Sequence, residues 1–180
     1  MIVEEKTLKS EMIYEGAILN LRKDEVTVRD GRTSQREIIE HNGGVLILGI
    51  TKDGKIPMVK QYRKSAECAV LELPAGRLEI GEDLAYAAER EFREETGYRV
   101  ANIRKVSQFY PAIGYSNELL HLFFATGLTP GETDFDENEA IDIIEYSPEE
   151  LELMLENNTI IDGKTILGLL WYFDQDRKTR

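Results

Sequence analysis

The chain has 180 residues, of which 42% are hydrophobic, and a formal net charge of −12 at pH 7. This length and composition predict a globular protein with one sizeable core, alone or with a small appendage. Such an excess of acids argues against a protein that holds the nucleic-acid backbone, which requires a basic face. An acidic protein that handles phosphates needs a positive group to offset its own field, and a divalent cation is the obvious candidate.

The single cysteine, Cys68, excludes an intramolecular disulfide and a cysteine metal cluster. A reducing cytoplasm is the simplest compartment for such a chain. Residues 1–11 carry too many charges for a signal peptide. The longest apolar stretch, residues 43–50, is far shorter than the roughly 20 residues of a membrane helix. We therefore expect a soluble cytoplasmic protein that makes no membrane contact.

Residues 1–42 are predicted to form a β-region distinct from the main domain, residues 43–180. Leu19 and Leu21, and then Val26 and Val28, have the period-two spacing of strands, and RDGRTS at 29–34 is typical of a turn. So short a β-region buries little surface by itself. We expect it to pack on the main domain or on a second subunit.

Further strands are predicted at 45–51, 56–61, 70–73, 100–110, 119–126 and 140–146. The sequence TKDGK, residues 51–55, is typical of a hairpin turn between the first two of these strands. Helices are predicted from Leu84, from Pro148 behind a Ser147 cap, and over residues 164–173. Strands interspersed with a few helices indicate a mixed α/β or α+β layered domain.

The helix that begins at Leu84 carries acids on its apolar side. With an advance of about 100° per residue, Leu84, Ala88 and Phe92 share one side of the helix. Glu91 and Glu95 fall in the same sector. Burying two like charges side by side is costly unless they are protonated, paired or bound to a cation.

By the same angles, the arginines of this helix do not pair with both acids. Arg90 and Arg93 are predicted to point away from them, Glu94 to border them, and Glu89 to face solvent. A hard divalent cation bound by carboxylate oxygens is the best solution. Mg²⁺ typically uses one or two carboxylates together with waters and substrate phosphates.

The loop before this helix supports a ligand site. Gly76 and Gly81 would let the backbone approach a ligand closely, and Gly97 suits the helix end. A backbone carbonyl near Ala75 is a further candidate oxygen ligand.

These residues fit the Nudix box, G-x5-E-x7-R-E-U-x-E-E-x-G-U, in which U is apolar or aromatic. Its named positions are filled by Gly76, Glu82, Arg90, Glu91, Phe92, Glu94, Glu95, Gly97 and Tyr98. Residues 59–83 and 109–125 resemble the ADP-ribose pyrophosphatase branch of the Nudix family, as does the strand-rich N-terminal extension. The resemblance therefore covers nearly the whole chain.

The resemblance implies a Nudix fold, in which mixed β-sheets are sandwiched between helices, with an N-terminal antiparallel β appendage. It implies hydrolysis of ADP-ribose to AMP and ribose 5-phosphate with Mg²⁺ or Mn²⁺, in a homodimer whose appendages exchange between subunits. Two alternatives stay open: hydrolysis of other nucleoside diphosphate sugars or dinucleotides, and a non-catalytic Nudix domain that senses a ligand. The intact box argues against the second, because a binding module need not keep the box glutamates.

The resemblance also implies roles for individual residues. Glu91, Glu95 and the carbonyl of Ala75 resemble the metal ligands. Glu94 resembles the acid that holds another metal or its water. Arg90 resembles the residue that orients the box glutamates, and Glu82 completes that support.

The second acidic cluster, residues 134–146, is by composition most simply a solvated loop. A calcium loop is excluded because Glu139 stands where the turn needs glycine. In the branch that the chain resembles, a loop after the box supplies a glutamate that acts as a base or positions water. Glu139 fits that place best, and Glu137 is the reserve.

Substrate-binding candidates come from three segments. Arg63 resembles an arginine that faces the catalytic cleft near the diphosphate, and Glu72 is its expected partner. Arg36, in the N-terminal strands, is a weaker phosphate-binding candidate. Gly114 and Ser116 belong to a loop that the resemblance places near the terminal ribose, although the sequence there is equally compatible with a simple turn.

Two other sites are excluded by their residues. The sequence DGKT has the Lys164 and Thr165 of a phosphate-binding loop, but Asn158 replaces its first glycine. His41 and His121 are the only histidines and lie far apart in the sequence, so a structural role is a better interpretation than zinc binding.

Overall fold

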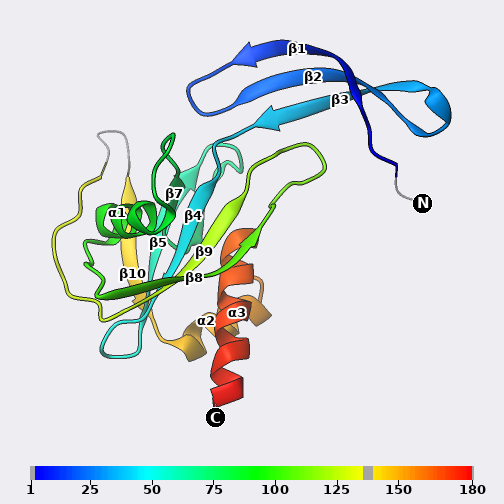
Figure 1. Ribbon diagram of the computed structural model, residues 1–180. Coiled ribbons are helices and arrows are strands. Elements are labelled where there is room, and N and C mark those ends of the chain that lie inside the picture. The colour runs from blue at the N-terminus through cyan, green and yellow to red at the C-terminus, as the bar shows by residue number, and fades with distance from the viewer. Residues whose placement is uncertain (1–2, 136–139, 180) are drawn as a thin grey trace. The chain divides into compact units, whose positions relative to one another are not determined.

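The computed structural model describes residues 3–135 and 140–179 (Figure 1). The chain divides into two compact units, one of residues 1–43 with 110–119, the other of residues 44–109 with 120–180. Each unit is described by itself.

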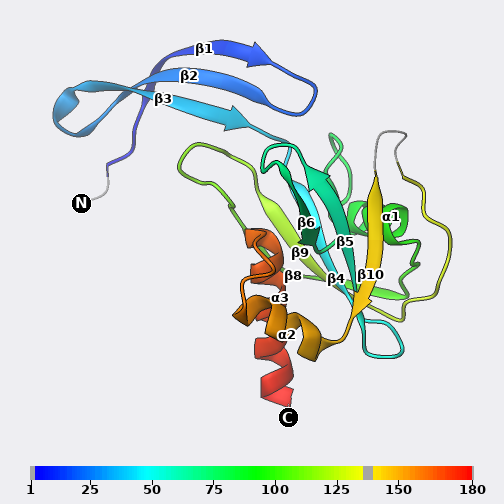
Figure 2. The same ribbon diagram turned by 180° about the vertical axis from the view of Figure 1, so that it is seen from behind.

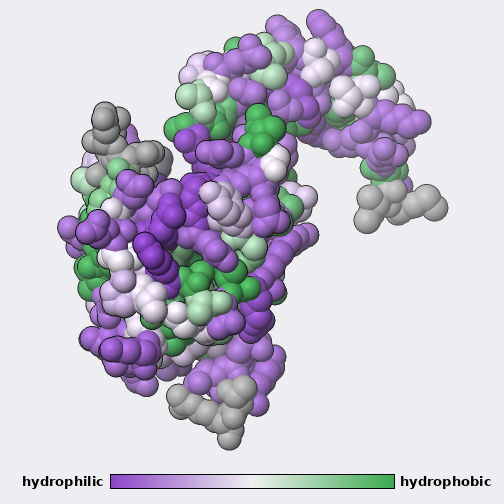
Figure 3. Space-filling model, turned by 60° about the vertical axis from the view of Figure 1, so that its left-hand side comes forward, coloured by the Kyte–Doolittle hydropathy of each residue, from purple (hydrophilic) through white to green (hydrophobic). Residues whose placement is uncertain are grey.

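The first unit is a three-stranded antiparallel sheet in the order β1-β2-β3. Its strands are β1 (Thr7–Glu15), β2 (Asn20–Thr27) and β3 (Thr33–Glu40), with a short 3₁₀ turn, η1 (Arg29–Gly31), between the last two. The predicted turn at 29–34 is therefore confirmed. Every residue of β1 is exposed, and Figure 3 shows apolar residues among hydrophilic ones on this sheet.

Residues 110–119 belong to the first unit, which the sequence did not indicate. The backbone N–H of Ile39 donates to the carbonyl of Tyr115 at 2.8 Å, and the N–H of Asn117 donates to the carbonyl of Ile39 at 3.1 Å. The side chain of Asn117 in turn accepts from the N–H of His41 at 2.8 Å. These bonds attach the loop to the end of β3.

In the described residues of the second unit, the strands form two sheets accompanied by three helices; Figure 2 shows their arrangement. A mixed four-stranded sheet has the order β7-β4-β9-β8, in which β4 and β9 are parallel, and an antiparallel sheet has the order β10-β5-β6. The elements are β4 (Gly44–Gly49), β5 (Ile56–Arg63), β6 (Cys68–Glu72), β7 (Ala75–Arg77), α1 (Leu84–Thr96), β8 (Asn102–Phe109), β9 (Leu120–Thr126), β10 (Ile141–Tyr146), α2 (Pro148–Glu156) and α3 (Gly163–Thr179).

Strand β4 separates two apolar clusters because successive side chains of a strand point to opposite faces. Val45 and Ile47 pack in the cluster that contains Phe92 of α1. Leu46 and Leu48 pack in the cluster that contains Leu169 of α3. The mixed sheet is thus covered by helices on both faces, and the predicted fold class is confirmed.

The predicted hairpin at TKDGK is wrong. The turn itself forms, since the N–H of Thr51 donates to the carbonyl of Lys55 at 2.9 Å. However, β4 and β5 lie in different sheets. All of β4 is buried and its two edges are taken by β7 and β9, so β5 has no place beside it.

The predicted ends of α1 and the predicted start of α2 are confirmed, whereas α3 continues beyond the predicted 164–173 to Thr179. The side chain of Asp83 caps α1, and Gly97 ends it with a left-handed φ of 73°. Ser147 caps α2 in a capping box with Glu150. Among residues 3–135 and 140–179, no helix is both long and apolar enough to span a bilayer.

Candidate active site

The acids of α1 meet the backbone of β7. Oε2 of Glu95 accepts the backbone N–H of Ala75 at 3.0 Å, and Glu95 is only 6% exposed. A Cβ on Gly76 would lie 1.9 Å from the Cδ of Glu91, so the glycine is needed for the carboxylate to occupy this place. Two box glutamates, one helical turn apart, therefore converge on two residues of β7, Ala75 and Gly76.

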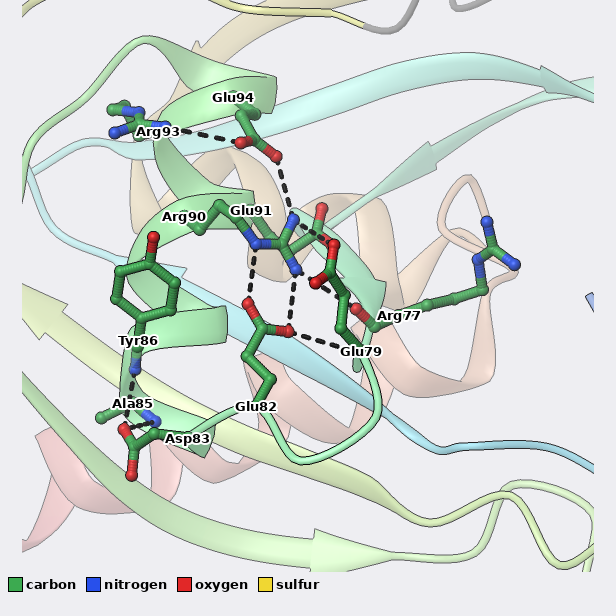
Figure 4. A network of polar contacts seen from close by, with 10 residues as sticks. All are labelled: Arg77, Glu79, Glu82, Asp83, Ala85, Tyr86, Arg90, Glu91, Arg93 and Glu94. Atoms are coloured by element: carbon green, nitrogen blue, oxygen red, sulfur yellow. Dashed lines mark hydrogen bonds and ion pairs between the residues drawn. The ribbon is translucent and has the colours of Figure 1, made fainter.

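Arg90 contacts three box acids at once (Figure 4). Its Nε and Nη2 donate to the two oxygens of Glu82 at 2.8 and 3.1 Å. Its Nη1 donates to Glu91 at 2.9 Å and to Glu94 at 3.0 Å. The hydrogen bonds to Glu82, followed by the charge of Glu91, raise the pKa of Arg90 above its ordinary value and keep the guanidinium charged.

The angular prediction that Arg90 points away from the acids is wrong. The angle of a Cα on the helix does not fix the head group of a long side chain, which can fold back along the helix surface. Glu89, in contrast, is exposed as predicted. The orientation of the box glutamates by Arg90, which the family resemblance implies, has the contacts that it requires.

Glu82 fixes Arg90 to the loop before the helix. Besides its two bonds to Arg90, Glu82 accepts the backbone N–H of Glu79 at 3.0 Å. Its hydrogen bonds with Arg90 hold the pKa of the Glu82 carboxyl below its ordinary value. The acid and the arginine thus form a charged pair that supports the other box acids.

Arg63 and Glu72 form the expected pair. Nε and Nη2 of Arg63 donate to the two oxygens of Glu72 at 2.6 and 2.8 Å. Glu72 is buried and also accepts from Nζ of Lys164. Burial opposes ionisation of Glu72, but the hydrogen bonds from these cations outweigh it, so its pKa lies below the ordinary value. The contact of Glu72 with Lys164, which is 92 residues away along the chain, is not indicated by the sequence.

The donor set fits a hard divalent cation, because Glu91, Glu95, Glu94 and the carbonyl of Ala75 offer only oxygen. Within the described part of the chain, no three acidic, histidine or cysteine side chains come together as a metal cluster. A site of one or two carboxylates completed by waters and substrate phosphates requires no such cluster. The metal-ligand assignment therefore stays a prediction.

The remaining candidates lie in the first unit or outside the described residues. Arg36 lies in the first unit, where its Nε donates to Glu5 at 2.8 Å. Gly114 and Ser116 also belong to the first unit, where the Ser116 hydroxyl accepts the N–H of Glu118 at 3.1 Å. The two candidates for the base, residues 137 and 139, lie outside the described residues.

The fold and the box together define a Nudix protein. Residues 40–167 match the NUDIX domain, and residues 5–39 match the nucleoside diphosphate sugar hydrolase N-terminal domain. The chain belongs to the Nudix family.

Among its relatives, the methanol dehydrogenase activator of Bacillus methanolicus is 40% identical over 170 residues, which are 93% of this chain and 92% of the relative. The ADP-ribose pyrophosphatase of Bacillus subtilis (strain 168) is 39% identical over 169 residues, 93% of this chain and 91% of the relative. A crystal structure of an ADP compounds hydrolase matches with a TM-score of 0.87 over 99% of this chain and 97% of the other, at 18% identity, and supports the fold alone.

Proposed function

We propose that the protein is a divalent-metal-dependent hydrolase that cleaves the pyrophosphate bond of ADP-ribose to give AMP and ribose 5-phosphate. The observation that carries this proposal is the convergence of Glu91 and Glu95 on the backbone of β7, with Arg90 bonded to the neighbouring acids. The near full-length similarity to an ADP-ribose pyrophosphatase supports the substrate.

In this proposal, the carboxylates of Glu91 and Glu95 and the carbonyl of Ala75 hold the metal, Mg²⁺ or Mn²⁺, with Glu94 beside them. When bound, such a cation lowers the pKa of a water molecule and neutralises charge on the diphosphate. Arg90 keeps the carboxylates oriented through its bonds to Glu91 and Glu94.

Substrate binding is assigned to Arg63, whose side chain is 40% exposed and still carries its charge beside Glu72. Its guanidinium would donate to the diphosphate oxygens. Glu139, or else Glu137, would orient or deprotonate the water that attacks phosphorus in line with the leaving phosphate oxygen. Gly76 contributes backbone close to the ligand, while Arg36, Gly114 and Ser116 remain candidates for contacts with the rest of the substrate.

The composition and the exposed surface also bear on the partners, the oligomeric state and the compartment of the enzyme. The net charge of −12 favours a small phosphorylated substrate, bound through a cation, and disfavours nucleic acid as a partner. The fully exposed strand β1 of the first unit favours a homodimer in which residues 1–42 exchange between subunits. One free cysteine favours the cytoplasm.

One observation favours a second function. A relative of equal similarity is named a methanol dehydrogenase activator, so action upon another enzyme is a rival to metabolite hydrolysis. Other nucleoside diphosphate sugars and dinucleotides are rival substrates of the same chemistry, and a ligand sensor without turnover is a further rival.

One experiment separates these functions. The purified protein is incubated with Mg²⁺ and, in turn, with ADP-ribose, nucleoside diphosphate sugars and dinucleotides, and the released nucleotide is quantified. We expect the highest kcat/KM with ADP-ribose and release of AMP with ribose 5-phosphate. Preference for another diphosphate would change the substrate, and absence of turnover on all of them would favour a sensor or an activator.

A further inference from the structure

The first turn of α3 is organised by one acid. Asp162 precedes the helix, and its Oδ2 accepts the backbone N–H of Thr165 at 3.0 Å and the Thr165 hydroxyl at 2.6 Å. The same oxygen lies 2.9 Å from Nζ of Lys164. Asp162 is therefore the N-cap of α3 and also orients two side chains of its first turn.

Both of these side chains reach the connection between β6 and β7. The Thr165 hydroxyl accepts the backbone N–H of Leu73 at 2.8 Å, and both residues are fully buried. Nζ of Lys164 donates to Glu72. One turn later, a Cβ on Gly168 would lie 2.6 Å from Cδ1 of Leu73, so this glycine lets the helix pack tightly on the same residue.

Each residue from Glu72 to Ala75 has a polar partner on another segment. Lys164 binds Glu72, and Thr165 binds the N–H of Leu73. The carbonyl of Pro74 accepts from the N–H of Ile47 at 2.9 Å. The last residue, Ala75, donates its N–H to the box acid Glu95. The first turn of α3 thus holds one end of a short segment whose other end lies at the candidate metal site.

Glu72 also links this turn to Arg63. Arg63 and Lys164 share the single negative charge of the buried Glu72 carboxylate. The positive charge of Arg63 is therefore only partly neutralised. The pKa of Arg63 is raised mainly by its bonds with Glu72 and, to a smaller degree, by the charges of Glu95 and Asp162. Arg63 therefore lies within electrostatic reach of the box as well as of the α3 turn.

We propose that Asp162, Lys164 and Thr165 form a positioning clamp that sets the segment Glu72–Ala75 and, through Glu72, the guanidinium of Arg63 for diphosphate hydrolysis. Lys164 balances the charge of Glu72 and leaves the positive field of Arg63 available to phosphate. Thr165 sets the backbone that leads to Ala75. This inference rests on the proposed hydrolysis and adds three positioning residues to it.

The two arms of the clamp have different kinetic signatures. Lys164→Met leaves Glu72 to Arg63 alone, so we expect KM for ADP-ribose to rise roughly tenfold with a smaller change in kcat, and Lys164→Arg to restore most of the loss. Thr165→Val keeps the side-chain shape but removes the acceptor for Leu73, so we expect kcat to fall roughly tenfold with little change in KM. Lys178→Met is the matched control, because Lys178 pairs with Asp174 on the exposed surface of the same helix.

A readout without turnover completes the test. Amide hydrogen exchange of Leu73 and Ala75, measured by NMR on the metal-free protein, should be faster in Thr165→Val than in the wild type and unchanged in Lys178→Met. The clamp is overturned if Thr165→Val and Lys164→Met lower only the melting temperature while kcat, KM and both exchange rates stay as in the wild type. If the wild type hydrolyses no diphosphate, the proposed function fails, and the exchange rates alone decide whether the turn holds the segment.

Discussion

Glu91 occupies the space that a side chain on Gly76 would need: a Cβ there would lie 1.9 Å from Cδ of Glu91 and 2.1 Å from its Oε2. Since the obstructing atoms are the far end of a flexible side chain, Gly76→Ala should displace the carboxylate and leave the fold intact. We expect turnover of ADP-ribose to fall at least about 100-fold, with a stability cost of about 1–3 kcal/mol, as measured by steady-state kinetics and urea unfolding.

A double-mutant cycle tests the cause of that loss. If Gly76→Ala acts by moving Glu91, adding it to Glu91→Ala should cause almost no further decrease in kcat. Additive losses would mean that the glycine acts by another route, such as contact with the substrate.

Arg90→Lys should separate charge from geometry at the box. Lysine keeps the positive charge but cannot donate two parallel bonds to Glu82 while it also contacts Glu91 and Glu94. We expect kcat/KM to fall roughly 10- to 100-fold, as for other residues that orient metal ligands. Arg93→Lys serves as the control, since Arg93 is exposed and its contact with Glu94 is long, at 3.4 Å. Equal activity of the two variants would contradict the orienting role.

Glu82 should make folding stability depend on pH. Its pKa is held below the ordinary value of 4.5 by Arg90, so its contribution is present above about pH 4.5 and is lost as the pH falls through the folded-state pKa. In urea unfolding between pH 7 and pH 3, the wild type should be more stable than Glu82→Gln at neutral pH. The gap between the two should shrink as the pH decreases, and a constant gap would refute the linkage.

Divalent metal should stabilise the folded protein through Glu95. With Mg²⁺ or Mn²⁺ at 100 times its dissociation constant, the gain is about 2.7 kcal/mol, which a thermal melt before and after chelation detects. Glu95→Gln should abolish this gain and lower turnover by roughly two orders of magnitude or more, with little change in the metal-free melting temperature. Glu89→Gln, on the exposed side of the same helix, should keep both properties.

Replacement of the acid proposed to orient the attacking water should lower kcat without weakening substrate binding. We expect Glu139→Gln to lower kcat strongly and to leave the dissociation constant for ADP-ribose almost unchanged, as compared by kinetics and calorimetry. Glu137→Gln is the paired variant. If only that variant shows the pattern, the role belongs two residues earlier in the chain.

The box spacing predicted much of the site because helix geometry is local. The sequence placed the start of α1 at Leu84 and its end at Gly97, and the helix angles put Glu91 and Glu95 on one side, where they meet β7. The helix angles misplaced the guanidinium of Arg90, because a long side chain is not directed by its Cα angle, although the resemblance to the box implied its contact with the glutamates.

Non-local pairing was harder to predict. The run from Gly44 to Gly49 is apolar without alternation, which is typical of a strand buried on both faces, but this signal does not indicate which strands take the two edges of β4. The partners of Glu72 and Leu73 on α3 lie 92 residues away, and nothing local in the sequence indicates such contacts.

The membership of residues 110–119 in the first unit has a consequence for recombining this protein with its relatives. The chain passes from one unit to the other after residues 43, 109 and 119, so the N-terminal sheet is not a detachable module. A chimaera that exchanges residues 1–42 alone would separate β3 from the native partners of Ile39, which are Tyr115 and Asn117. A graft with compatible boundaries carries both segments, because the two have to be inherited together.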